Sequence, residues 1–359
     1  MSVLSENPIT HSVAWRSPSN IALVKYWGKY GQQYPQNPSV SFTLSQSYSE
    51  TQVSCRLRAS SEKGKPVSFD FVFHGQANPA FALKIEQFLI SQLSEFPFLS
   101  DYHLQISSSN SFPHSSGIAS SASGMSALTL CLCSLDKLNG GLLANMDEAA
   151  FFQKASCISR LGSGSACRSL YPQAALWGTC SFLDESSQDY AIPYQEYLHP
   201  VFHNYCDTIL IVSRREKSVS SRAGHGLMEQ HPYSSVRYQQ ANKHLEQLHR
   251  ILQTADLEGF IDLVELEALE LHALMMSSSP SFILMQPNTL AVIAQIRRFR
   301  QETGCPICFT LDAGPNVHVL YPQTVKAQAE ALIKETLLTY CEDQYCIWDC
   351  AGNGPVQII

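Results

Sequence analysis

Apolar and polar residues alternate along the first third of the chain, as they do in half-buried β-strands. In the segment 39–59 the alternation places Val53 and Leu57 on one face. The segment 65–75 (KPVSFDFVFHG) alternates in the same way and ends at a glycine. Residues 102–110 (YHLQISSSN) have a third pattern of this kind. We therefore expect three strands and an N-terminal region rich in β-structure.

Helical spacing occurs twice in the same region. Apolar residues recur every three or four positions over 79–93, which predicts a helix there. The same spacing begins at Met125 and continues to Leu135, so a second helix is expected over 125–138.

The second half of the chain combines apolar strands with amphipathic helices. We expect a buried strand at 206–213, helices at 232–254, 256–276 and 288–303, strands at 305–311 and 317–321 around a turn at 312–316, and two short strands joined by a glycine turn within 344–359. Strands and helices mix in both halves without steady βαβ alternation. This mixture favours an α+β fold over a doubly wound sheet.

The length of 359 residues favours two domains, because a single compact domain is usually shorter. No internal repeat is evident. The stretch 184–200 (DESSQDYAIPYQEYLHP) is polar and contains proline, which is typical of a junction. We therefore expect an N-terminal domain over 1–190 and a C-terminal domain over 191–359.

Composition limits the classes of partner. The formal net charge is −7, which argues against a nucleic-acid-binding protein, although an anionic small molecule could still bind in a cleft. The apolar runs are shorter than the roughly 20 residues that a membrane span needs. The N-terminus lacks the basic flank and apolar core of a signal peptide, so we expect a cytoplasmic protein without membrane or nucleic-acid partners.

The twelve cysteines are expected to be reduced thiols, since most of them lie in apolar runs. Cys305 and Cys308 form a CxxC pair, and three further cysteines follow late in the chain. A structural zinc site is the alternative interpretation. It is disfavoured because Cys308 lies in a strand-like segment and no second CxxC follows.

The run SSGIASSASG, residues 115–124, consists of small uncharged residues between an expected strand and an expected helix. A helix N-terminus leaves backbone N–H groups without partners, and a loop of small residues lets a polyphosphate approach them. The hydroxyls of Ser120, Ser121 and Ser123 could add donors or a magnesium ligand. The run is neither a Walker A loop nor a GxGxxG motif. The alternative is that these residues only cap and pack a buried helix.

Three other stretches carry candidate chemistry. Lys25 and Lys29 lie four apart in KYWGK and would suit a diphosphate, although a surface lysine pair is the alternative. Arg168 follows the glycines of RLGSGSACRSL and could pair with a carboxylate, or could be a solvated residue after a turn. Asp312 ends the apolar strand of FTLDAGPN, where it could act near a reacting hydroxyl or simply begin the turn.

Together these stretches resemble a known family. FPHSSGIASSASG is similar to the phosphate loop P-x3-G-L-x-S-S-A of the GHMP kinases. NIALVKYWGK, this loop, GSGSACRSL and DAGPN occur here in the order found in the mevalonate diphosphate decarboxylase family, and VSSRAGHGLMEQHPY also resembles a family segment near the substrate. The similarity spans roughly residues 15 to 320.

The resemblance implies a two-domain α+β GHMP kinase fold with the active site in a cleft between the domains, commonly as a homodimer. It implies ATP-dependent conversion of mevalonate 5-diphosphate to isopentenyl diphosphate, ADP, phosphate and CO2, with ATP and Mg²⁺ required. By motif, Asp312 would orient and deprotonate the 3-hydroxyl, Lys25 would lie near the transferred phosphoryl group, and Arg168 would bind the C1 carboxylate with Asn20 as a neighbouring donor.

The resemblance also implies two sets of binding residues. The substrate would contact Tyr26, Trp27, Gly28, Lys29, Ser163, Gly164, Ser165, Ala166, Cys167, Arg168 and Arg222. The ATP phosphates, with Mg²⁺, would contact Pro113, Ser116, Gly117, Ile118, Ala119, Ser120, Ser121, Ala122 and Ser123. No residue is singled out as a metal ligand, and the histidines within 225–231 receive no role.

Some residues depart from the family pattern. Ile118 replaces the usual leucine of the loop, and Arg222 stands where some relatives have threonine. An arginine there could bind the diphosphate or indicate a different substrate end. Two alternatives follow: a relative that acts on the 5-monophosphate, and a kinase that phosphorylates the 3-hydroxyl without decarboxylation. A non-catalytic nucleotide-binding module is the alternative from another class, and the Asp312, Lys25 and Arg168 set argues against it.

Overall fold

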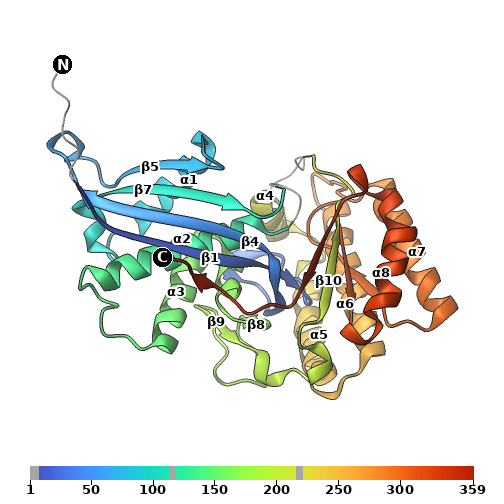
Figure 1. The fold of residues 1–359 in the computed structure, drawn as a ribbon. Helices are drawn as coiled ribbons and strands as arrows, with labels where there is room; N and C mark the ends of the chain where they lie inside the picture. The colour runs from blue at the N-terminus through green and yellow to red at the C-terminus, as the bar shows by residue number, and fades with distance from the viewer. Residues whose placement is uncertain (1–7, 114–117, 216–220) are drawn as a thin grey trace.

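The computed structural model describes residues 8–113, 118–215 and 221–359. Two large sheets organise these residues, one in each half of the chain, and helices cover both (Figure 1). A third, two-stranded sheet pairs β2 Lys29–Tyr30 with β3 Tyr34–Pro35. The chain ends beside the first sheet, because its last strand returns to pair with the first one (Figure 1).

The first sheet has eight strands, and its long central strands position the candidate site. Its main path runs β14–β1–β4–β7–β5–β6, and β8 and β9 extend it from β4. The bounds are β1 Ile9–Ala22, β4 Ser39–Leu57, β5 Ser68–Phe73, β6 Gln76–Ala77, β7 Tyr102–Asn110, β8 Ala174–Trp177, β9 Ala191–Pro193 and β14 Val356–Gln357. The strands predicted at 39–59, 65–75 and 102–110 are confirmed as β4, β5 and β7.

The strand β1 was not predicted. Its sequence, ITHSVAWRSPSNIA, is rich in serine and contains a proline, which cannot donate to a sheet ladder. The structure accommodates Pro18 at a register shift between Pro18 and Asn20, while β1 pairs antiparallel with β4 on both sides of the shift. Burial on both faces of this central strand also removes the alternation that marks half-buried strands.

Three helices complete the first half: α1 Pro79–Ser91, α2 Ser120–Leu138 and α3 Glu148–Gly162. Leu128, Leu132 and Leu135 of α2 join apolar residues of the sheet and of α3 in one core. The side chain of Asp147 caps α3 by accepting the N–H of Ala150 at 2.8 Å. The helix α1 confirms the prediction at 79–93, α2 begins five residues before the predicted 125, and α3 was not predicted.

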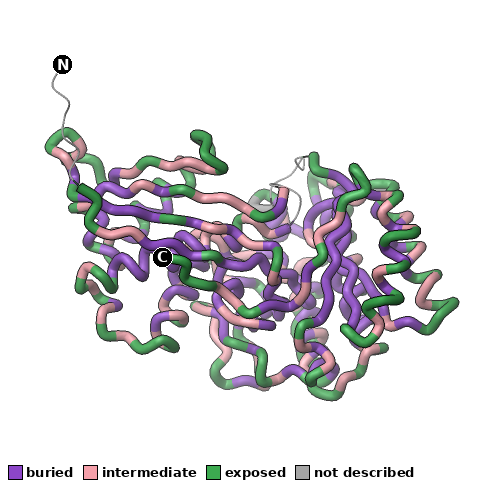
Figure 2. Tube along the Cα trace, in the orientation of Figure 1, coloured by how far each residue is buried: buried purple, intermediate pink, exposed green. Residues whose placement is uncertain are grey.

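The second sheet has four antiparallel strands in the order β11–β12–β10–β13. They are β10 Cys206–Leu210, β11 Cys308–Thr310, β12 Val317–Tyr321 and β13 Cys346–Cys350. On one face lie α7 Pro287–Thr303 and α8 Lys326–Glu335, and on the other lie α5 Ser234–Thr254 and α6 Leu257–Met276. Figure 2 shows this sheet as a buried layer between helices with exposed outer faces.

Sequence patterns located the elements of this half well. The helices predicted at 232–254, 256–276 and 288–303 agree with α5, α6 and α7 within two residues. The strand predicted at 305–311 is shorter, because only β11 pairs in the sheet. The helix α8 was not predicted.

The expected domain boundary after residue 190 falls one residue before β9, which pairs with β8 of the first sheet. The return of β14 to β1 also carries the end of the chain into the first half. The boundary therefore stays a prediction. Within the described ranges, no helix is long and apolar enough to cross a bilayer.

Candidate active site

A cleft of about 630 Å³ lies between the two halves and collects most of the residues singled out in the sequence. Those that line it are Asn20, Lys25, Tyr26, Trp27, Lys29, Ile118, Ala119, Ser120, Ser121, Ser163, Ser165, Arg168 and Asp312. Four segments far apart in the chain therefore meet in one cleft.

Lys25 and Asp312 form an ion pair at the base of this cleft. The Nζ of Lys25 lies 2.9 Å from Oδ1 of Asp312. The side chain of Lys25 is 2% exposed to solvent, and that of Asp312 is 27% exposed. Burial lowers the pKa of Lys25, against the opposing charges of Asp312 and Glu267. Burial would raise the pKa of Asp312, but the neighbouring Lys25 holds it below its usual value, so the carboxyl is ionised at neutral pH.

The turn after β11 directs the Asp312 carboxylate into the cleft. The main-chain carbonyl of Asp312, not its carboxylate, accepts the N–H of Gly314 at 2.7 Å. The same carbonyl accepts Nε2–H of His272 at 3.1 Å. Burial lowers the pKa of His272 to about 4, so this ring is neutral and tethers the turn to α6. The carboxylate is thereby left for Lys25 and for a ligand.

Arg168 is buried, which excludes the alternative of a solvated residue after a turn. It lies in the 3-10 helix Gly164–Leu170, is 3% exposed, and donates from Nη1 to the hydroxyl of Ser39. Its Nε has no hydrogen-bond partner, and in the described part of the chain no carboxylate forms an ion pair with it. A buried guanidinium that lines a cleft and forms no ion pair is suited to bind an anionic group of a ligand.

Asn20 lies beside Arg168 but does not match its expected role as a donor. Its Nδ2 already donates to the carbonyl of Ser165 at 3.1 Å and to the hydroxyl of Ser169 at 2.8 Å. The atom left buried without a partner is Oδ1, which can only accept. Asn20 thus fixes the 3-10 helix that carries Arg168.

The N-terminus of α2 opens on the cleft, as the sequence predicted for the serine-rich run. Ala119 precedes the helix with a φ of +24°. The hydroxyls of Ser121 and Ser163 lie 3.3 Å apart where the loop meets the end of α3. Residues 114–117, which include Ser116 and Gly117 of the expected phosphate loop, lie outside the described residues.

Some predicted contact residues are buried away from the cleft. Ser123 is fully buried and its hydroxyl lies 2.7 Å from that of Ser49 in β4, so it cannot serve as a ligand from its side chain. The others that do not line the cleft are Gly28, Pro113, Ala122, Gly164, Ala166 and Cys167. The side chain of Arg222 lies outside the described part. Gly164 packs directly beneath Tyr26, which itself lines the cleft: a Cβ at Gly164 would lie 2.7 Å from the Tyr26 hydroxyl.

His225 contacts the segment that carries Lys25 and Lys29, and no role was predicted for it. The main-chain N–H of Gly28 donates to its Nδ1 at 2.9 Å. Its ring packs against Tyr26 and Trp27 at 4.6 and 4.5 Å between centroids. Gly28 has a φ of +110°, which favours glycine at this bend. Two glycines flank His225 in AGHGL, and this pattern only weakly indicates a functional histidine.

The far wall of the cleft is apolar. It is formed by Phe71, Phe73, Phe81, Phe88 and Ile106 from β5, α1 and β7. Ser120 and Ser121 at the N-terminus of α2 line the same cleft, so a ligand with phosphates at these serines could place a flat ring against the apolar side chains.

One group of described residues has the spacing of a metal site: His244, Glu267 and Glu270. The guanidinium of Arg237 bonds to both carboxylates, so a cation already occupies the position that a metal would take. No cysteine in the described ranges joins such a group, and all twelve are free thiols. Cys305 and Cys308 are both buried, and they belong to two different apolar clusters.

Comparison with known proteins places this cleft in a family. Residues 17–188 match the diphosphomevalonate decarboxylase-like N-terminal domain, and residues 208–351 match the mevalonate 5-diphosphate decarboxylase C-terminal domain. The diphosphomevalonate decarboxylase of Ganoderma lucidum is 30% identical over 339 residues, which cover 89% of this chain and 80% of that protein. The chain belongs to the diphosphomevalonate decarboxylase family.

Solved members of the diphosphomevalonate decarboxylase family share the fold. The mevalonate diphosphate decarboxylase of Staphylococcus aureus is 28% identical, with a TM-score of 0.79 over 97% of this chain and 98% of that one. The structure of MDDEF in complex with MVAPP, AMPPCP and magnesium has the same identity, TM-score and coverage. The α+β GHMP kinase fold expected from the sequence is confirmed.

Proposed function

We propose that this chain catalyses the ATP-dependent decarboxylation of mevalonate 5-diphosphate to isopentenyl diphosphate, with ADP, phosphate and CO2 as the other products. The observation that carries the proposal is the base of the cleft, where the Lys25–Asp312 pair and the buried, incompletely partnered Arg168 meet. Family membership supplies the substrate class. The diphosphate is preferred here on the strength of Lys25 and Lys29, which both line the cleft.

Asp312 is the proposed general base. Its pKa lies below the usual value, so at neutral pH it can accept a hydrogen bond from the tertiary 3-hydroxyl and take its proton as phosphoryl transfer proceeds. Phosphorylation converts hydroxide, a poor leaving group, into phosphate. Lys25 holds the carboxylate in place and supplies a positive charge next to the oxygen that receives the phosphoryl group.

Arg168 is the proposed partner of the C1 carboxylate. The phosphate at C3 leaves with its bonding electrons, and the C1–C2 bond then supplies the electrons of the new double bond as CO2 departs. The guanidinium must hold the carboxylate until that step without binding it so strongly that the ground state is favoured. Lys29, Tyr26, Ser163 and Ser165 line the cleft nearby and would contact the rest of the substrate.

The N-terminus of α2 is the proposed phosphate site of ATP. Backbone N–H groups at a helix start and the hydroxyls of Ser120 and Ser121 suit a polyphosphate, and the apolar wall at Phe73 and Phe81 suits the nucleobase. Magnesium would neutralise phosphate charge when it is bound. The serine hydroxyls that line the cleft are the oxygen ligands this chain offers to it, and such ligands suit Mg²⁺.

One coupled assay tests the proposal. ADP and CO2 are followed with mevalonate 5-diphosphate and, in parallel, with the 5-monophosphate. Equal amounts of ADP and CO2 from the diphosphate are expected. Release of ADP without CO2 would indicate a 3-kinase, and turnover of the monophosphate at least about tenfold faster would overturn the diphosphate assignment, since tenfold corresponds to about 1.4 kcal/mol of discrimination.

We also propose a cytoplasmic homodimer with domains at 1–190 and 191–359. The twelve free cysteines support a reducing compartment. The family matches end at 188 and begin again at 208, which supports a junction between them. Light scattering of the purified protein is expected to give twice the mass of the 39.9 kDa chain, and the mass of one chain would refute the dimer.

A further inference from the structure

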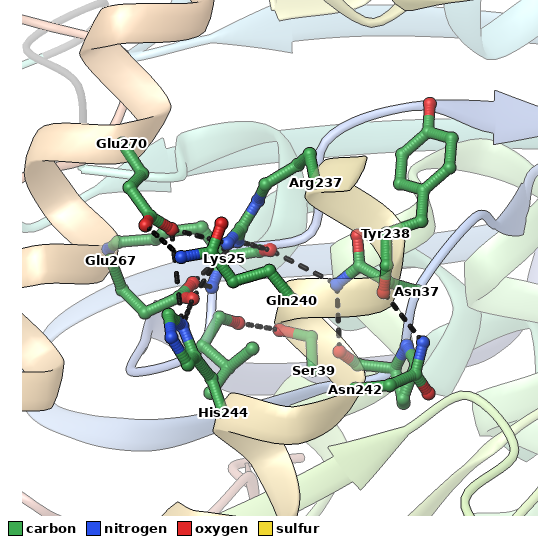
Figure 3. Close-up of polar contacts among 12 residues, drawn as sticks. Lys25, Asn37, Ser39, Arg237, Tyr238, Gln240, Asn242, His244, Glu267 and Glu270 are labelled. Atoms are coloured by element: carbon green, nitrogen blue, oxygen red, sulfur yellow. Dashed lines mark hydrogen bonds and ion pairs between the residues drawn. The ribbon is translucent and has the colours of Figure 1, made fainter. Parts of the chain in front are cut away.

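Four charged or titratable side chains of α5 and α6 gather around Lys25 (Figure 3). We call Arg237, His244, Glu267 and Glu270 the α5–α6 ion cluster. Arg237 Nη2 and Nη1 donate to the two oxygens of Glu267 at 2.5 and 2.7 Å, and Nη1 also donates to Glu270 at 2.8 Å. His244 donates from Nδ1 to Glu267 at 2.5 Å.

This cluster holds the main chain of Lys25 from both sides. The N–H of Lys25 donates to Oε2 of Glu267 at 2.7 Å, and its carbonyl accepts Nη2 of Arg237 at 2.9 Å. Asn37 adds a second donor to that carbonyl at 3.1 Å. Lys25 lies past the end of β1 and outside any sheet, so these side chains satisfy main-chain groups that a strand would satisfy.

Stability alone does not account for the cluster. The Glu267 side chain is 0% exposed and that of Arg237 is 3% exposed. A buried ion pair roughly balances its desolvation cost, and apolar residues of similar volume often stabilise a fold as well or better. Neither side chain lines the cleft. Glu267 and Arg237 are distinguished by their contact with the main chain of Lys25, whose ammonium group bonds to Asp312.

We propose that Glu267 and Arg237 are positioning residues: they fix the main chain of Lys25 across the two halves so that its Nζ stays on Asp312. The reading of Lys25 as part of the active site rests on the proposed function. The charge of Glu267 has a second effect. It opposes the lowering of the pKa of Lys25 by burial, together with Asp312, whereas Arg168 on the other side adds to the lowering. The charge of Lys25 also acts on His272, whose pKa of about 4 keeps that ring neutral at neutral pH.

The test compares Glu267→Gln with a matched control on the same helix. Glu265 is also buried in α6 and pairs with Arg297 and Arg300 of α7, but it does not contact Lys25. For Glu267→Gln we expect kcat to fall at least about tenfold with little change in KM, and the alkaline limb of the pH profile to move about one unit lower. Glu265→Gln is expected to lose stability but keep kcat within about threefold and leave the limb in place.

Glu267→Asp separates position from charge. It keeps the carboxylate but shortens its reach by one methylene, so kcat is expected to fall while the alkaline limb stays where it is in the wild type. If Glu267→Gln fails to fold, Arg237→Lys tests the positioning role as Glu267→Asp does, because it keeps the charge and loses the planar fork, so kcat is expected to fall while the alkaline limb stays in place. Equal behaviour of the Glu267 and Glu265 variants would overturn the proposal.

A direct measurement distinguishes this inference from the proposed function. An NMR titration of the lysine side-chain carbons, with Lys25 assigned from Lys25→Met, reads the pKa of Lys25 without any substrate. A lower pKa in Glu267→Gln with an inactive wild type would mean that only the proposed function is wrong. An unchanged pKa and unchanged kcat in an active enzyme would mean that the positioning role is wrong.

Discussion

At the base of the cleft the chain places three charges, the buried Lys25 and Arg168 and the partly exposed Asp312, whereas at the α2 end it places small hydroxyl residues and phenylalanines. The base depends on single groups with defined partners, such as the 2.9 Å contact between Lys25 and Asp312. The α2 end offers several backbone and hydroxyl donors at once. Substitutions at the base are therefore expected to reduce catalysis strongly, whereas substitutions at the α2 end are expected only to weaken nucleotide binding.

Asp312→Asn is expected to have the largest effect on the difference between the two ends of the cleft. The amide keeps the shape but cannot accept the hydroxyl proton, so we expect kcat to fall by about 10²- to 10⁴-fold. Nucleotide affinity, measured by calorimetry, should stay within about threefold because the α2 end is untouched. Asp262→Asn, at an exposed position of α6, is the control. Near-normal CO2 release by Asp312→Asn would mean that the base has been misassigned.

Arg168→Lys tests the second charge at the base. Lysine keeps the charge but lacks the planar fork, so kcat/KM for mevalonate 5-diphosphate should fall by about 10- to 100-fold, as expected for a charge-assisted hydrogen bond of about 1.5–3 kcal/mol. The KM for ATP should barely change. Arg250→Lys, at an exposed site on α5, is the matched control. A loss confined to ATP would contradict the carboxylate assignment.

His272 should make the base of the cleft sensitive to acid. Its pKa is about 4 in the folded protein and about 6.5 in the unfolded chain, so below pH 6.5 the unfolded state binds the additional proton. The stabilisation is complete above pH 6.5 and is lost as the pH falls toward 4. Between pH 7 and pH 5 we expect the free energy of unfolding to fall by about 2 kcal/mol more than in His272→Gln. Denaturant unfolding at the two pH values measures it, and equal losses would refute the assignment.

The smallest effect is expected at the α2 end, from a pair of serines. Ser121 lines the cleft, so Ser121→Ala should raise the KM for ATP by about 2- to 10-fold and leave kcat nearly unchanged. Ser123 bonds instead to Ser49 inside the protein, so Ser123→Ala should cost about 1 kcal/mol of stability and leave the KM unchanged. The reverse pattern would mean that the loop presents different serines to the nucleotide.

Much of the candidate site could be predicted because its motifs are local. Asp312 follows an apolar strand within a glycine turn, and Arg168 follows two glycines in a run of small residues, so residue type and spacing made both of them candidates and the family resemblance implied their roles. The sequence did not distinguish Ser121 from Ser123, because both lie in the same small, uncharged run. Their difference comes from the face of α2 that packs on β4.

The residues that support the site were missed for a different reason. Arg237 and Glu267 are 212 and 242 positions away from Lys25 in the sequence. The residues next to them in the chain form no recognisable motif. A Glu and an Arg on amphipathic helices normally face solvent. Only the packing of α5 and α6 against each other and against β4 and β11 turns them inward.

The sequence alone was sufficient to locate α5, α6, α7 and the central strand β4, because periodicity and local backbone preference act within a few residues. The tertiary structure decided which charges are buried and which partners they have. The energy of a charge depends on its solvation and on neighbours within a few ångströms. Those neighbours come from segments hundreds of positions apart, and only the folded chain brings them to Lys25.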